Sequence, residues 1–136
     1  MKKLSFIIFT FCLLFASCNN DNDDNVLQEE GSQKLEKMYN ELITGSLVNS
    51  QPCTDPKEWA FTAVNLSACG SDARFIVYSK KINTAAFLDK VKKYQEAKIA
   101  FDTKWKIVSV CDIIKTPTGV DCVDGKPTLT YNHVIY

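Results

Sequence analysis

The sequence predicts a small single domain of the α+β class. Antiparallel β-hairpins are expected to pack against one long amphipathic helix, together with a shorter N-terminal helix. Three observations support this. Apolar side chains recur at helical spacing over residues 83–105, strand-like segments occur in pairs separated by turn residues, and residues 34–136 suffice for one hydrophobic core.

The chain opens with a segment typical of exported proteins. Two lysines precede the apolar run LSFIIFTFCLLFA, which is shorter than the roughly 20 residues needed to span a bilayer. The run ends in Ala16 and Ser17, directly before Cys18. This pattern resembles the lipobox of bacterial lipoproteins, although Phe15 stands where Leu, Val or Ile is usual. The resemblance implies removal of the signal peptide 1–17 and attachment of diacylglyceryl and acyl (palmitate-type) chains at Cys18. An ordinary secretory signal and an uncleaved anchor are the alternatives.

Residues 18–33, CNNDNDDNVLQEEGSQ, are acidic and contain few apolar side chains. Such a segment buries too little surface to offset the entropy of ordering, so we expect a disordered tether between the lipid and a domain of residues 34–136. An acidic tract soon after a lipidated cysteine is also similar to the surface-export signal of lipoproteins in Bacteroidota. That similarity implies a lipid-anchored protein of the cell outer membrane, exposed at the surface rather than facing the periplasm.

The charge balance argues against nucleic acid as a partner. The chain has 16 basic and 16 acidic side chains, and the formal net charge is +0. Two lysines leave with the leader and five acids lie in the expected tether, so the domain carries 14 basic against 11 acidic side chains. A nucleic-acid-binding domain is usually far more basic.

The first half of the domain predicts one helix and one hairpin. Residues 34–44 place apolar side chains at helical spacing, and Gly45 can end this helix. Residues 58–66 then alternate, with Trp59 and Phe61 on one face, which is typical of a strand. The sequence ACGSD reads as a turn, and the β-branched and aromatic residues 73–79 form the second strand of the hairpin.

Residues 83–105 give the clearest element, a long helix that Asn83 can cap. Lys98 lies inside its apolar stripe, where its aliphatic stem can pack while the amine reaches outward. Core packing explains such a stripe more simply than a cofactor site does. The stripe consists of Phe87, Val91, Tyr94, Phe101 and Trp105.

The last part of the chain predicts a second hairpin. Residues 106–111 read as a short third strand or its beginning, and Pro117 makes residues 112–119 a loop. Residues 120–131 then alternate around Asp124 and Gly125, which form a strong two-residue turn signal.

Cysteine usage agrees with export. Cys12 leaves with the leader, and four cysteines remain in an oxidising compartment besides the lipidated one: Cys53, Cys69, Cys111 and Cys122. Two disulfide bonds are expected, and four cysteines allow three connectivities. The shortest loops favour pairing 53 with 69 and 111 with 122.

From Cys53 to Tyr131 the pattern resembles a group of small cysteine-containing lipoproteins of Bacteroidota whose function is uncharacterised. The resemblance implies a disulfide-stapled extracytoplasmic domain, and it transfers no catalytic residue. The tail NHVIY is an extension beyond it. The landmarks that carry the resemblance are Trp59, Phe61, the Cys69-Gly70 turn, Tyr78, Ser79, Phe87, Val91, Tyr94, Trp105, Ser109, Cys111, Pro117, Cys122 and the DGKP turn at 124–127.

The residues do not form a convincing catalytic set, so no enzyme activity, cofactor or metal is expected. The chain has one histidine, His133, near a chain end that is expected to fray. The cysteines lack the close spacing of zinc sites and of CxxC redox motifs. Asp112, Asp121 and Asp124 gather near the last hairpin, but acids in turns more often serve as turn formers than as a hydrolase pair.

Lysines gather on and around the long helix, where acidic residues are interspersed. We favour a solvated helix face over a patch for an anionic partner. These lysines are Lys80, Lys81, Lys90, Lys92, Lys93, Lys98, Lys104 and Lys106.

The sequence therefore predicts a non-enzymatic, lipid-anchored binding or structural module with an unidentified protein or glycan ligand. The alternative is an inhibitor of an envelope-attacking hydrolase such as a lysozyme or protease, since a pre-ordered loop loses little entropy on binding. A hydrolase built on carboxylates is a third hypothesis. The candidate binding loop is 112–121, its ends joined by a Cys111–Cys122 bond, with the contact residues Ile113, Ile114, Lys115, Thr116 and Pro117.

Overall fold

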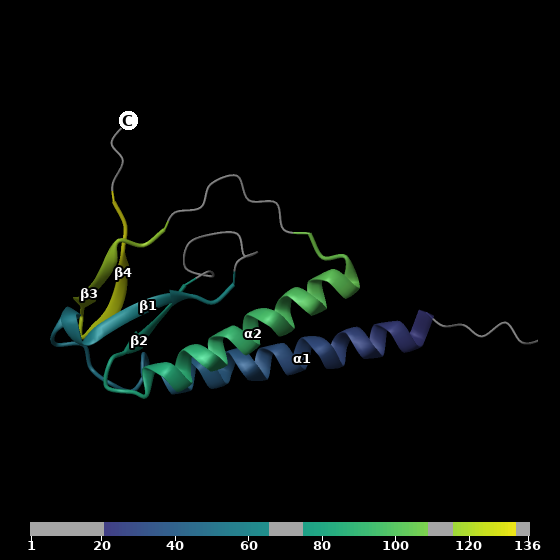
Figure 1. Cartoon of the computed structure of the whole chain (residues 1–136), viewed down its shortest axis with the longest axis horizontal. Helices are drawn as coiled ribbons and strands as arrows, with labels where there is room; N and C mark the ends of the chain where they lie inside the picture. The colour runs from purple at the N-terminus through teal and green to yellow at the C-terminus, as the bar shows by residue number, and fades with distance from the viewer. Residues whose placement is uncertain (1–20, 66–74, 109–115, 133–136) are drawn as a thin grey trace, which may run out of the picture.

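The computed structural model describes residues 21–65, 75–108 and 116–132, and it has the expected small α+β architecture (Figure 1). Two helices lie along one side, and two antiparallel hairpins gather at one end. The elements in chain order are α1 (Asp21–Ser46), the 3₁₀ turn η2 (Pro56–Glu58), β1 (Trp59–Ala63), β2 (Phe75–Ser79), α2 (Thr84–Trp105), β3 (Gly119–Val123) and β4 (Lys126–Thr130).

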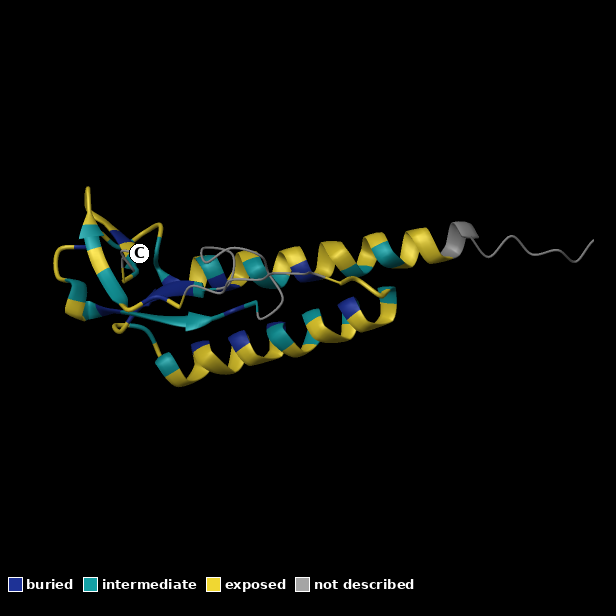
Figure 2. Ribbon diagram, turned by 90° about the horizontal axis from the view of Figure 1, so that it is seen from above, coloured by how far each residue is buried: buried dark blue, intermediate teal, exposed yellow. Residues whose placement is uncertain are grey.

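Helices α1 and α2 run antiparallel and pack along their lengths (Figures 1 and 2). The predicted range of α2 is confirmed, because the Asn83 side chain accepts a hydrogen bond from the Ala86 N–H at 3.1 Å and caps the first turn. At the other end, Lys106 adopts a left-handed conformation with φ 53° and its N–H bonds back to the helix carbonyls.

Helix α1 differs from the prediction at both ends. It begins at Asp21 rather than at residue 34, so residues 21–33, expected to be a disordered tether, are helical. It also continues through Gly45 to Ser46. Packing at Gly31 explains part of the extension: the absence of a side chain lets α1 approach α2 here, since a Cβ on residue 31 would lie only 2.8 Å from the Phe101 ring. The two helices therefore approach closely at this point, and the helix propagates outward from a packed segment.

The β1–β2 hairpin separates two apolar clusters. It is antiparallel, with Trp59 opposite Ser79 and Ala63 opposite Phe75. The face that includes Ala60, Ile76 and Tyr78 packs on the helices. This confirms the predicted alternation over Trp59–Ala63, whereas Glu58 belongs to η2 and residue 66 lies outside the described residues. The main core comprises Leu35, Leu42, Val64, Ile76, Tyr78, Phe87, Val91 and Tyr94.

The β3–β4 hairpin turns where the sequence predicted. Asp124 and Gly125 both have positive φ, 51° and 73°, which suits a tight two-residue turn between twisted strands. The expected strand over residues 106–111 is not seen at 106–108, because Lys106 closes α2 there. Its remaining residues, 109–111, lie outside the described part of the chain.

The disulfide pairing expected from short loops is wrong. Cys53 is bonded to Cys122, with a Cα–Cα distance of 5.3 Å and a sequence separation of 69 residues. Both 53–69 and 111–122 are therefore excluded. The cost of closing a loop grows only with the logarithm of its length, so tertiary packing decides the pairing. Cys69 and Cys111 lie outside the described residues.

Candidate functional site

The disulfide lies inside a second apolar cluster, between the two hairpins. Cys53, Trp59 and Val77 are buried there. The half-buried residues that pack on them are Val48, Phe61, Val120, Cys122 and Leu129. The β3–β4 hairpin thus attaches to the rest of the domain through one apolar face.

The other face of this hairpin is open to solvent. Side chains alternate along each strand, so Asp121 and Val123 of β3 share a face with Lys126 and Thr128 of β4. All four are exposed. We call the surface formed by Asp121, Val123, Lys126 and Thr128 the outer hairpin face. It combines one carboxylate, one amine, one hydroxyl and one aliphatic side chain.

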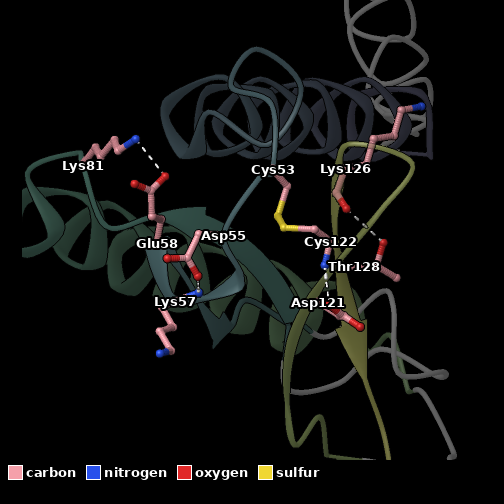
Figure 3. The surroundings of a disulfide bond; sticks show 9 residues. All are labelled: Cys53, Asp55, Lys57, Glu58, Lys81, Asp121, Cys122, Lys126 and Thr128. Carbon is pink, nitrogen blue, oxygen red and sulfur yellow. Dashed lines mark hydrogen bonds and ion pairs between the residues drawn. A yellow bond between two sulfur atoms is a disulfide. The ribbon is translucent and has the colours of Figure 1, made fainter.

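Three contacts order the hairpin, and the first of them, the disulfide, is drawn in Figure 3. The disulfide fixes the middle of β3 through Cys122. The Cys53 N–H donates to the carbonyl of Gly125 at 2.8 Å, which fixes the turn. Before β3, the Thr118 N–H donates to the carbonyl of Thr130 at 2.7 Å and lengthens the ladder. The outer hairpin face is therefore carried by an ordered scaffold.

The segment that follows Cys53 is itself held by local bonds. The Asp55 carboxylate accepts from the Lys57 N–H at 2.9 Å and caps η2. Glu58 pairs with Lys81 at 2.8 Å (Figure 3), and the Glu58 carbonyl accepts from the Lys80 N–H at 2.8 Å. These bonds tie the disulfide-bearing loop to the end of β2, so the staple joins two ordered parts.

Two of the acids near the last hairpin, Asp121 and Asp124, make local contacts in the strand and in the turn. The Asp121 carboxylate accepts from the Cys122 N–H at 2.8 Å, and Asp124 forms the left-handed turn. Asp112 and His133 lie outside the described residues. In the described ranges, no group of three or more His, Cys, Asp or Glu side chains is arranged to hold a metal ion.

The predicted binding loop is only partly described. Ile113, Ile114 and Lys115 lie outside the described residues, while Thr116 is exposed and Pro117 is buried at the entry to β3. The idea that a Cys111–Cys122 bond closes this loop is wrong, because Cys122 is bonded to Cys53. Pro117 thus anchors the chain instead of offering a contact.

The helix pair carries an open groove of 630 Å³. Gln33, Lys37, Asn40 and Thr44 of α1 line it together with Lys90 of α2. The groove is open and its lining residues are exposed to solvent, whereas small-molecule sites enclose most of the ligand. We therefore do not assign a small-molecule site to it.

Several lysines of α2 and its flanks form ion pairs with acids. Lys93 pairs with Asp89 at 2.7 Å, and the hydrogen bond and positive charge of Lys93 hold the pKa of Asp89 below its usual value. Ion pairs also join Lys81 to Glu58, Lys92 to Glu96 and Lys98 to Asp102. These pairs support the prediction of a solvated helix face.

Lys98 and Asp102 form the most buried of these pairs. The Lys98 amine lies 2.5 Å from one Asp102 carboxylate oxygen and 2.6 Å from the other. The amine therefore bonds to a buried carboxylate on the same helix instead of reaching outward to solvent as predicted. Nearby, burial raises the pKa of Tyr94, and the charges of Tyr39 and Asp102 act in the same direction.

Sequence reasoning did not identify the outer hairpin face. The signal was present, because residues 120–123 alternate between side chains that pack inward and side chains that are exposed. What the sequence did not reveal was which face the disulfide would hold against the body of the domain.

No family model, curated protein or solved structure matches this chain. Within the described ranges, no helix combines the length and the apolar character that a membrane span requires.

Proposed function

We propose that this protein is a lipid-anchored binding module of the cell envelope, without enzyme activity. In this proposal, lipid on Cys18 holds it at the outer membrane, on the cell surface. The outer hairpin face binds a protein or glycan partner. The observation that carries the proposal is that this stapled, solvent-exposed face lies at the end of the molecule opposite the start of α1 (Figure 1).

The length of α1 supports this orientation. Its 26 residues rise about 1.5 Å each, so the helix is about 39 Å long. In sequence, α1 begins three positions after Cys18. A lipid on Cys18 would therefore place the membrane beside one end of the molecule and leave the hairpins at the other, accessible to a partner.

The chemistry of the outer hairpin face favours a macromolecular partner. It is an exposed strand surface on which a negative carboxylate, a positive amine and a hydroxyl surround the aliphatic Val123. A hairpin already held by a disulfide loses little conformational freedom on binding, so more of the contact energy appears as affinity. The inhibitor hypothesis used the loop closed by residues 111 and 122. Without that bond, nothing in the described residues favours a hydrolase over another protein or a glycan.

The experiment is capture of a partner from intact cell envelope and from a glycan array, with the lipidated protein as bait. The double variant Val123→Glu/Lys126→Glu changes the outer hairpin face. The matched control, Leu88→Glu/Lys90→Glu, makes the same change in charge on exposed positions of α2. We expect the hairpin variant to lose at least tenfold in capture and the control to retain it.

Equal capture by both variants, or no partner from either source, would overturn the binding role.

The anchor is tested separately by mass spectrometry of the native protein. We expect an N-terminal peptide that begins at Cys18 and carries acyl chains. A bare thiol at this position, or a retained leader 1–17, would refute lipid anchoring.

A further inference from the structure

Exposed apolar side chains collect at the end of the helix pair where α1 begins. Val26 and Leu27 of α1 are 55% and 48% exposed. Ile107 and Val108, which follow α2 directly, are 40% and 81% exposed. Four of the seven large apolar side chains exposed in the described residues therefore belong to this end, whereas the other three are scattered.

The packing of the helices places the start of α1 beside the end of α2. Gly31 lies against Phe101, and the helices are antiparallel, so one turn further along each helix brings residue 27 level with residue 105. Trp105 is half-buried, with its ring 6.3 Å from that of Phe101. The start of α1 projects past the end of α2, with largely exposed residues (Figure 2). We call Val26, Leu27, Trp105, Ile107 and Val108 the basal patch.

Lysines border the basal patch. The Lys104 amine lies 4.6 Å from the centre of the Trp105 ring, and Lys106 is exposed at the end of α2. A tryptophan beside lysines and aliphatic side chains is the composition of protein surfaces that settle at the water–lipid boundary. Asp24, Glu29 and Glu30 are exposed on α1 nearby. These acids favour a zwitterionic headgroup layer over a strongly anionic one.

We propose that the basal patch lies on the headgroup layer of the membrane that carries the anchor. The inference rests on the proposed function, because Cys18 is three positions before α1. Three residues span at most about 11 Å when extended, so a lipid on Cys18 would hold the first turns of α1 next to the bilayer. An apolar patch kept at that distance meets lipid before it meets any other partner.

This contact would convert a lipid tether into an oriented attachment. A chain held by lipid alone rotates about the anchor, whereas the basal patch adds a second point of contact on α1 and α2. The long axis of the helix pair then carries the hairpins away from the bilayer, so the outer hairpin face stays accessible.

Quenching of tryptophan fluorescence by brominated lipid tests the proposal. The native lipidated protein is placed in vesicles of phosphatidylethanolamine and phosphatidylcholine, with bromine near the headgroup end of the acyl chains. The variants Trp59→Phe and Trp105→Phe separate the two emissions. We expect brominated lipid to reduce Trp105 emission at least twofold and to leave Trp59 emission unchanged. Equal Trp105 emission with and without bromine would overturn the proposal.

Matched variants identify the surface responsible. Val26→Ser/Leu27→Ser removes exposed apolar side chains from the basal patch, whereas Leu88→Ser/Ile99→Ser removes them from the exposed side of α2. Because all four positions are exposed, both variants should fold. We expect the first pair to abolish Trp105 quenching and the second to preserve it. No loss from the first pair, or equal loss from both, would contradict the assignment.

A second form of the protein separates this proposal from the proposed anchor. Residues 1–18 are replaced by a histidine tag bound to nickel-chelating lipid, and every residue that the structure describes is kept. If mass spectrometry finds Cys18 unmodified, the lipid anchor is refuted. Trp105 quenching in the tagged protein would still support the affinity of the basal patch for lipid, and its absence would refute that affinity whatever the state of Cys18.

Discussion

Removing the Cys53–Cys122 bond should cost a large part of the stability of this domain. The bond spans a sequence separation of 69 residues, and closing a loop of that length lowers the entropy of the unfolded chain by about 15 cal/mol/K, or about 4.4 kcal/mol at 25 °C. If Cys69 is bonded to Cys111, the shortest closed path falls to about 28 residues and the effect to about 3.6 kcal/mol. We therefore expect Cys53→Ala/Cys122→Ala to lower the free energy of unfolding by about 4 kcal/mol.

Urea unfolding followed by Trp59 fluorescence measures this effect, because Trp59 lies in the same apolar cluster as the disulfide. The matched control is Cys69→Ala/Cys111→Ala, which keeps the described bond. The reasoning is refuted if Cys53→Ala/Cys122→Ala changes the free energy of unfolding by less than about 1 kcal/mol. Peptide mapping without reductant that joins Cys53 to another cysteine would also refute it.

Three further predictions concern the second cysteine pair, the helix contact and a buried phenol. Peptide mapping should join Cys69 to Cys111, the pairing left by the described bond, and two free thiols would contradict this. Gly31→Ala should lower the free energy of unfolding by about 1 kcal/mol, because the clash of its Cβ with Phe101, at 2.8 Å, outweighs the gain in helix propensity. In a Phe101→Ala background the same change should stabilise, and equal effects in both backgrounds would exclude the contact. Burial raises the pKa of Tyr94, so with rising pH the tyrosine hydroxyl loses its proton in the unfolded chain before it does in the folded protein. The free energy of unfolding should therefore fall as the pH rises above about 10. Tyr94→Phe should flatten that fall in thermal melts from pH 9 to 11.5, and an unchanged profile would count against this cause.

Elements defined by local chemistry could be predicted from the sequence. Asn83 marks the start of α2 because its side chain replaces a missing backbone acceptor, and this contact involves residues three apart. Asp124 and Gly125 fix the second hairpin because both tolerate positive φ. In each case the decisive interaction lies within one turn of chain, so composition and spacing suffice to find it.

Features that depend on distant partners could not be predicted in this way. Cys53, in the loop before η2, pairs with Cys122 of β3 because an apolar cluster brings the two segments together, and no short-range pattern encodes that approach. The start of α1 was missed for a similar reason. Residues 21–33 lack apolar periodicity, and Gly31 becomes favourable in a helix only because the Phe101 ring of α2 occupies the space of its missing Cβ. The outer hairpin face, too, is defined only once the inner face has a partner.

The long α1 links the two proposed surfaces through one rigid body. A disordered segment of 16 residues would let the domain sample many orientations, and the basal patch would then meet lipid only occasionally. A helix from Asp21 removes that freedom, because its first turns carry Val26 and Leu27 while its last turns pack against the β1–β2 hairpin. Melting the start of α1 should therefore affect lipid contact without affecting the stapled end.

Pro is poorly tolerated inside a helix, at a cost of about 3 kcal/mol, so Glu29→Pro should abolish Trp105 quenching by brominated lipid. Capture of a partner by the outer hairpin face should persist in the same variant. If Glu29→Pro leaves the quenching intact, the continuous helix is not what orients the molecule.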